Sequence, residues 1–218
     1  TEFNIPTHEF VSIMFIPFAA ATAMILICCL FVSKEKIVLD SENSERIPKL
    51  RASFYIILFA LSIIIVFRVI PYWIGLVIIL ISLLIADRKA IAKVDYSLLG
   101  TFACMFVFAG NMSRIGIIKD ILSSLLEKNT LIFSALSCQV ISNVPSAVLL
   151  SQFTDNYADL LRGVNIGGTG TLIASLASLI TFREYTSRNP GKTGYYIGMF
   201  SLFNFVFLVV LLFICSFI

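Results

Sequence analysis

Long apolar stretches separated by short polar ones dominate this 218-residue chain. Residues 10–32 contain no charged side chain, and residues 195–218 contain none either. Each stretch reaches the roughly 20 residues that a helix needs to cross the hydrocarbon core of a bilayer. The pattern predicts an all-α integral membrane protein whose first and last spans lie in these two stretches.

Residues 53–86 form an apolar stretch that is too long for one span and is interrupted by Arg68 and Pro71. We expect a tight turn there between two short spans, 53–68 and 71–86, with the Arg68 side chain reaching toward the lipid headgroups. Together with the first span, these give three transmembrane helices in residues 1–95. The basic segments 33–51 and 87–95 are predicted to be loops.

Residues 96–218 read as a second part, in which the apolar stretches are shorter or broken. The run 98–109 has only half the length of a span and stops at Gly110. Residues 115–126 then carry apolar side chains at helical spacing and charged ones elsewhere, which is typical of an amphipathic helix at the membrane interface.

The apolar stretch 130–150 is broken in its middle by Ser142, Asn143, Val144 and Pro145. Proline removes a backbone donor and stops a regular helix from continuing. Broken helix at membrane depth is tolerated only where it is packed in protein or lines a wet cavity. We therefore predict a re-entrant helical hairpin over 130–150. The alternative is a proline-kinked span with a polar patch for helix packing.

After a predicted polar loop at 152–162, residues 163–180 form a glycine-rich stretch followed by an apolar one. Its first part is too rich in glycine for a regular helix, so the prediction is an unwound transmembrane helix. The alternative is a packing face of small residues. The polar and glycine positions that attract attention are Asn165, Gly167, Gly168, Thr169, Gly170 and Thr171.

Basic residues in short loops set the orientation of a multi-pass protein. Loops 33–51, 87–95 and 181–193 are the basic ones. All three lie on one side if 98–114 crosses the membrane once, 130–150 re-enters from the opposite side and 163–180 crosses back. The protein is predicted to lie in the plasma (inner) membrane with that side facing the cytoplasm. The C-terminus, at residue 218, is then outside.

Composition narrows the function classes. Only 13% of residues are charged, about half the share in a globular domain. The net charge of +3 resides in loops, so the lipid bilayer rather than nucleic acid is the expected partner. Five cysteines and one histidine show no metal-ligand spacing. No carboxylate lies inside a predicted span and no phosphate-binding loop motif occurs, so we expect neither an enzyme, nor a buried-carboxylate proton relay, nor a resident metal.

Two broken elements close in sequence are a pointer to a solute site in a transporter. We therefore expect substrate or ion binding at the following residues: Ser142, Asn143, Val144, Pro145, Asn165, Gly167, Gly168, Thr169 and Thr171. Na⁺ is the one cofactor considered, as a coupling ion held through Ser142, Asn143 and Gly168. Asn111 and Arg114 are a third candidate group, since an arginine in the membrane neutralises an anion. The alternative for Arg114 is an interfacial side chain at the end of a short helix.

Two runs, 140–150 and 160–177, resemble the C-terminal half of the ion transporter superfamily. That superfamily includes divalent-anion/sodium symporters, citrate transporters and arsenite efflux pumps. The Ser-Asn-Val-Pro tip is similar both to the Ser-Asn-Thr tip of the dicarboxylate symporters and to the Asn-x-Pro tip of arsenite-pump-like members. Position 144 is valine here, where the dicarboxylate symporters carry threonine.

The resemblance implies half of an inverted-repeat fold, elevator-type alternating access and an outside C-terminus. It also implies that an N-terminal half of the same transporter supplies the matching hairpin. We expect a homodimer that moves a small anion by secondary active transport, coupled to Na⁺ or H⁺. The alternatives are arsenite or antimonite efflux and, in a different class, a non-transporting membrane subunit.

Overall fold

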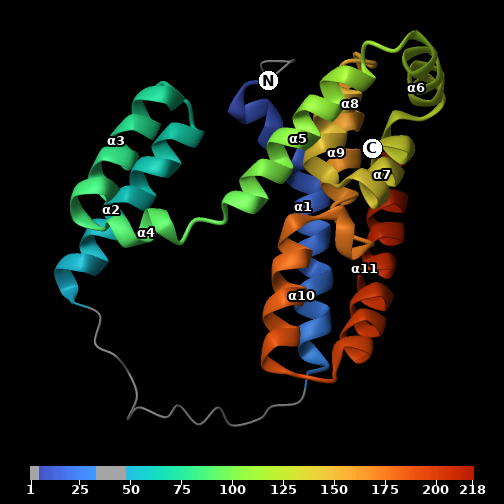
Figure 1. The fold of residues 1–218 in the computed structure, drawn as a ribbon. Helices are drawn as coiled ribbons and strands as arrows, with labels where there is room; N and C mark the ends of the chain where they lie inside the picture. Colours follow the sequence, from blue (N-terminus) through green and yellow to red (C-terminus); the bar gives the residue numbers. More distant parts are fainter. Residues whose placement is uncertain (1–4, 33–47) are drawn as a thin grey trace. The chain divides into compact units, whose positions relative to one another are not determined.

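The computed structural model describes residues 5–32 and 48–218, and every regular element in these two ranges is a helix (Figure 1). In chain order these elements are α1 (Thr7–Leu30), α2 (Lys49–Val66), α3 (Tyr72–Ala86), α4 (Arg88–Ala92), α5 (Tyr96–Met112), α6 (Gly116–Lys128), α7 (Thr130–Ile141), α8 (Asn143–Leu150), α9 (Tyr157–Ile166), the 3₁₀ turn η2 (Leu172–Ala174), α10 (Leu176–Arg188) and α11 (Thr193–Cys215).

Three of the described helices are long and apolar enough to cross a membrane, namely α1, α2 and α11. Their large apolar side chains are mostly exposed. A helix that is apolar on all sides and exposed on most of them fits a lipid environment. The predicted first and last spans are thus confirmed as long apolar helices, and Pro17 lies within α1 without ending it.

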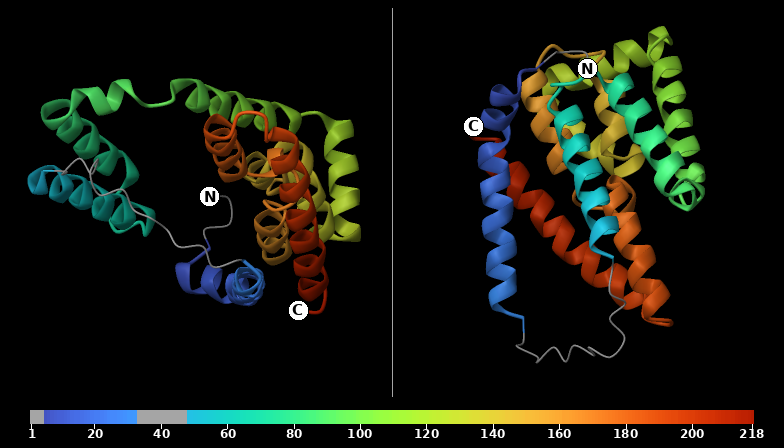
Figure 2. Two further views of the ribbon diagram at one scale, coloured as in Figure 1. Left: turned by 90° about the horizontal axis from the view of Figure 1, so that it is seen from below. Right: turned by 90° about the vertical axis from the view of Figure 1, so that its left-hand side faces the viewer.

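The described residues form two compact units, residues 5–32 with 98–218 and residues 48–97. The predicted boundary at residue 95 groups the first span with the next two, whereas in the structure α1 packs against α9 and α11. Figure 2 shows α11 beside α1 toward its C-terminal end and beside α10 toward its N-terminal end. Tyr196 of α11 packs there against Tyr185 of α10, with ring centroids 4.8 Å apart and the rings tilted by 34°.

Within the second unit, α2 and α3 are joined by the turn that the sequence predicted. Arg68 adopts a left-handed conformation with φ 58°, and Pro71 is the residue immediately before α3. The predicted loop 87–95 contains a short helix instead, α4. Asp87, which precedes α4, accepts hydrogen bonds from Tyr55 and Arg51 of α2 at 2.7 and 2.5 Å.

The stretch predicted to hold a half-length run and an amphipathic helix contains two helices, α5 and α6, that are bent by 93°. Leu126 of α6 is buried against the first unit's core, together with Cys138, Leu150, Leu160 and Val164. The charged residues of α6, Lys119, Asp120, Glu127 and Lys128, are exposed. The apolar stripe of α6 therefore packs against α7 and the core of this unit, which confirms the predicted amphipathic helix, while its place at the membrane interface stays a prediction.

The predicted break inside 130–150 occurs at Ser142, which separates α7 from α8 with φ 77° and ψ 155°. The two helices pack against each other as a hairpin. Asn129 begins α7 by accepting a hydrogen bond from the Ile132 amide at 2.8 Å. Pro145 lies in the first turn of α8, where its missing N–H would have no helical partner in any case.

The glycine-rich stretch differs from its prediction in where it unwinds. Residues 157–166 are helical as α9, so the expected loop 152–162 ends early and Gly163 is inside a helix. The unwound segment is 167–175, interrupted only by η2. Helix α10 then continues to Arg188 through most of the predicted loop 181–193. A Cβ at position 163 would lie 2.6 Å from Leu131 O of α7, so this helical position needs glycine for close helix packing.

Candidate functional site

The hairpin break and the unwound segment lie against each other. Helix α7 packs on α8, α9 and η2, which brings residue 142 close to residues 167–174 across about 30 positions of sequence. Ser142 Oγ donates a hydrogen bond to Ala174 O at 3.3 Å. The two sequence blocks that were predicted to form one site are therefore brought together by the structure.

Asn143 and Gly168 are neighbours at this junction. A Cβ built on Gly168 would lie 3.2 Å from Asn143 Nδ2 and 3.2 Å from Asn165 O. Asn143 Oδ1 accepts a hydrogen bond from the Val144 amide at 2.9 Å. Asn143 Nδ2 has no hydrogen-bond acceptor within the described part of the chain, so it is available to a ligand.

The other tip residues and Asn165 have different exposures. Val144 is 43% exposed, while Pro145 is buried. Asn165 is exposed, and its Nδ2 donates to Leu161 O one helical turn earlier at 2.8 Å. Asn165 Oδ1 thus remains open, and its backbone oxygen accepts from the Gly168 amide at 3.2 Å.

Gln139 holds the unwound segment, and the sequence reasoning missed it. Its Nε2 donates to Gly167 O at 2.8 Å and to Thr169 O at 3.0 Å. Its Oε1 accepts from the Thr171 amide at 2.9 Å. The available signal was an isolated amide side chain three residues before the helix break, in a stretch that is otherwise apolar.

The two threonine hydroxyls of the unwound segment already have partners in the chain. Thr169 Oγ1 donates to Ile166 O at 2.6 Å, and Thr171 Oγ1 donates to Gln139 O at 3.1 Å. Gly170 has φ 109°, a conformation that suits glycine. A Cβ there would also lie 2.3 Å from Gln139 Oε1.

Asn111 and Arg114 are not brought to this junction. Both are exposed, Asn111 in the last turn of α5 and Arg114 in the bend before α6. The Arg114 amide donates a local backbone hydrogen bond to Asn111 O at 3.1 Å. The interfacial alternative is the one that this placement favours.

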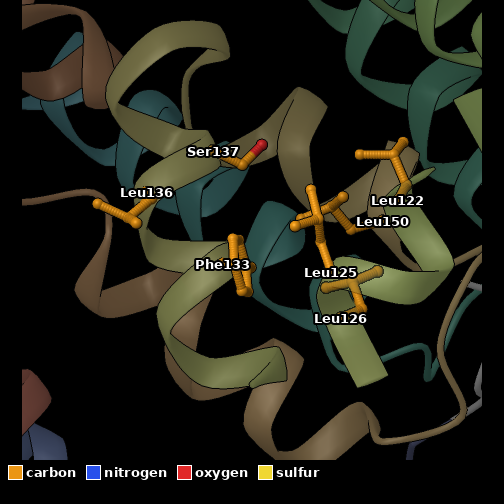
Figure 3. Close-up of a pocket in the computed structure, with 7 residues that line it drawn as sticks. All are labelled: Leu122, Leu125, Leu126, Phe133, Leu136, Ser137 and Leu150. Carbon is orange, nitrogen blue, oxygen red and sulfur yellow. The ribbon is translucent and has the colours of Figure 1, made fainter. Parts of the chain in front are cut away.

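A pocket lies between α6, α7 and the C-terminal end of α8 (Figure 3). It has a volume of about 310 Å³ and is lined by Leu122, Leu125, Leu126, Phe133, Leu136, Ser137 and Leu150. The Ser137 hydroxyl is already hydrogen-bonded to that of Ser146 at 3.0 Å. The lining is therefore apolar and offers little to an ion.

The chemistry at the tip is that of uncharged dipoles. The side chains that meet there are amides and hydroxyls, from Gln139, Ser142, Asn143, Thr169 and Thr171. The N-terminus of α8 lies at the same place, where the Val144 amide is bonded to Asn143 Oδ1 and Pro145 has no N–H, and helix N-termini favour negative charge. Such a site binds solutes by hydrogen bonds, and its carbonyl and amide oxygens suit a hard cation such as Na⁺.

Apolar spans combined with a broken hairpin and an unwound segment define a multi-pass membrane protein of the transporter class. Comparison with protein families then gives the family: the model described as "Citrate transporter" matches residues 1–162. The chain belongs to this citrate transporter family, within the ion transporter superfamily.

Two curated relatives agree with this assignment. An uncharacterized transporter of Methanocaldococcus jannaschii is 37% identical over 183 residues, covering 83% of this chain and 49% of its own length. The inner membrane protein YbiR of Escherichia coli is 34% identical over 117 residues, covering 52% of this chain and 32% of its own length. The chain thus spans about half or less of these relatives. No solved structure matches it.

Proposed function

We propose that this chain is the C-terminal half of a secondary active transporter that moves a small anion, coupled to Na⁺ or H⁺. The observation that supports this most is the meeting of the Ser142 break with the unwound segment 167–175. Backbone freed from helix at this depth needs protein or ligand partners. The chain belongs to a transporter family, and broken helices of this kind form substrate and ion sites in transporters.

The predicted residues divide into two roles in this proposal. Ser142, Asn143, Asn165 and Gly168 bind the solute or ion, because Asn143 Nδ2 and Asn165 Oδ1 have unused hydrogen-bonding capacity. A small residue at 168 allows close approach of a ligand to the backbone. The remaining predicted positions, Val144, Pro145, Gly167, Thr169 and Thr171, shape the junction rather than contact the solute.

The family suggests citrate as the first solute to test. A second candidate is efflux of arsenite or antimonite, which the uncharged character of the tip favours. The side chains that meet at the tip are uncharged amides and hydroxyls. Arsenite or antimonite in its neutral hydroxide form would be bound by amides and hydroxyls alone, whereas a carboxylate anion relies on the α8 N-terminus.

The experiment is uptake into proteoliposomes containing the protein as its gene encodes it, using radiolabelled citrate, phosphate and arsenite with and without a Na⁺ gradient. Asn143→Ala removes a partner at a desolvated centre, which costs roughly 1–3 kcal/mol, or about one to two decades in KM. Asn165→Ala should raise KM in the same direction. Asn189→Ala is the matched control, since that amide donates to Tyr185 O at the end of α10.

The packing alternative predicts the reverse pattern. Under it, Gly168→Ala lowers the yield of folded protein while both asparagine variants transport normally. Unchanged KM values for Asn143→Ala and Asn165→Ala at matched expression would therefore overturn the proposed site. No uptake of any solute by the wild-type protein would favour a non-transporting subunit.

The proposed placement is in the plasma (inner) membrane with segment 181–193 on the cytoplasmic side, and the chain is proposed to assemble as a homodimer. Ser187 is exposed near the end of α10. A cysteine introduced there in a cysteine-free background should resist an impermeant maleimide added to intact cells. Labelling from outside would reverse the orientation and place the C-terminus in the cytoplasm.

A further inference from the structure

One side chain on α7 supplies most of the hydrogen bonds that the unwound segment makes to the hairpin. Gln139 Nε2 lies 2.8 Å from Gly167 O, 3.0 Å from Thr169 O and 3.0 Å from Ala135 O. Gln139 Oε1 lies 2.9 Å from the Thr171 amide. A single carboxamide thus donates to two carbonyls of the segment and accepts from one of its amides.

These groups need a partner that comes from outside their own segment. The chain leaves the helix at residue 167, so Gly167 O, Thr169 O and the Thr171 amide lack the usual partners four residues away, while the amides of residues 167–169 still donate to carbonyls of α9. Buried backbone groups are nearly always paired. Gly170 is buried, and Gly167 is buried against Ala135 of α7. Water is therefore a poor substitute for the Gln139 side chain here.

The same geometry bears on the coupling ion. Three carbonyl oxygens converge on Gln139 Nε2, so this nitrogen occupies the position that a cation would take among them. The Nε2 group of Gln139 has two N–H donors and no acceptor, and its hydrogens carry partial positive charge. Gly167 O and Thr169 O are therefore already engaged.

We propose that Gln139 is the positioning residue of the transport site, holding residues 167–171 in the unwound form that sets Gly168 against Asn143 and taking the place of a cation among their carbonyl oxygens. Its role requires a donor and an acceptor on one side chain. The coupling cation accordingly does not use Gly167 O or Thr169 O. The effect on transport rests on the proposed function, whereas the effect on the segment itself does not.

Two substitutions separate the donor requirement from simple packing. Q139M keeps the length of the side chain and removes both polar functions. Q139E keeps the acceptor but, when ionised, turns two oxygens toward the carbonyls of Gly167 and Thr169. When protonated, its hydroxyl donates again. Burial and neighbouring carbonyl acceptors raise the pKa of such a carboxyl, so Q139E should behave like wild type at acid pH and like Q139M at alkaline pH.

Hydrogen–deuterium exchange of peptides covering residues 165–175 measures the segment directly. The sample is the protein as its gene encodes it, purified in detergent and compared with wild type at each pH. Q139M should exchange at least tenfold faster at pH 5 and at pH 8. Q139E should exchange tenfold faster at pH 8 and within twofold of wild type at pH 5. Q152E is the matched control, because Gln152 is exposed after α8.

Exchange within twofold of wild type for Q139M would overturn the proposal. Equal acceleration of exchange by Q139E at both pH values would also overturn it. That result would mean that the segment depends on the packing of the side chain and not on its hydrogen-bond donor. If Q139M fails to fold, the pH dependence of Q139E decides the question alone.

Uptake of radiolabelled citrate into proteoliposomes tests the positioning role. Q139M should raise KM at least tenfold with a smaller change in maximal rate, and Q139E should do so only at pH 8. Loosened exchange with unchanged KM would overturn the positioning role. Absence of citrate uptake by wild type would count against citrate in the proposed function, while the exchange experiment still decides the role of Gln139 in the segment.

Discussion

Two pairs of helices in this protein show different ways of packing, α7 with α9 and α2 with α3. At the first, a Cβ on Gly163 would lie 2.6 Å from Leu131 O, so the helices meet at backbone distance. At the second, a Cβ on Gly75 would lie 2.2 Å from Cδ1 of Ile65, so the contact is with the end of a side chain. Close packing through small residues is therefore concentrated where the hairpin and the unwound segment meet.

The polar groups of the two helix pairs also differ, because one group bonds to backbone atoms and the other to side chains. Gln139 lies inside the α7–α9 region and binds backbone groups 28 to 32 residues away. In the α2–α3 unit, the Arg51–Asp87–Tyr55 group lies at the helix ends and joins side chains only. Interior polar groups here fix an irregular backbone, while peripheral ones only tie helix ends together.

The largest effect is expected from Gly163→Ala. The added methyl group would meet Leu131 O at 2.6 Å and Ser134 Cβ at 2.7 Å, and a backbone oxygen cannot move aside without shifting α7. Overpacking of this kind costs about 1–3 kcal/mol, which exceeds the gain of up to about 1 kcal/mol from replacing glycine in a helix. The melting temperature in detergent should fall.

Gly198→Ala is the control for this substitution, because nothing lies within 4 Å of a Cβ at that position in α11. It should leave the melting temperature unchanged or raise it slightly. If Gly163→Ala were as stable as Gly198→Ala, the backbone contact between α7 and α9 would not be as close as described.

A smaller effect is expected from Gly75→Ala. Both Cδ1 and Cγ1 of Ile65 must move, so the side chain has to turn about its Cα–Cβ bond, and an off-rotamer side chain costs about 0.5–1.5 kcal/mol. The helix-propensity gain of up to about 1 kcal/mol offsets this. The net change should stay within about 1 kcal/mol, measured by the same melting curve. A loss as large as that of Gly163→Ala would remove the contrast between the two helix pairs.

The smallest effect is expected from Asp87→Asn. Hydrogen bonds from Tyr55 and then Arg51 lower the pKa of the Asp87 carboxyl. A carboxyl whose pKa is lowered by folding stabilises the fold above its usual titration range, and this contribution is lost as the pH falls through the lowered pKa. The difference in melting temperature between wild type and Asp87→Asn should therefore be present at neutral pH and vanish in strong acid. A difference that grows on acidification would give the opposite sign and exclude the ion pair as its cause.

Local signals in the sequence were enough for the long helices and for the breaks between them. Length and hydropathy alone predict α1 and α11, since a bilayer sets the number of apolar residues that a span needs. Proline predicts the turn before Pro71 and the break at Ser142. The pairing of the hairpin tip with the glycine-rich stretch was also expected from the sequence, and Ser142 contacts Ala174.

Tertiary structure decided where the glycine-rich stretch unwinds and what holds it. Gly163 looks like a helix breaker in sequence, yet it lies inside α9, and its lack of a side chain lets α7 pass closely. Gly167 begins the unwound segment because Gln139 accepts and donates the bonds that a helix would have supplied. Helix propensity acts over a few residues, whereas these contacts join positions about 30 apart, and only the packed chain brings them within hydrogen-bonding distance.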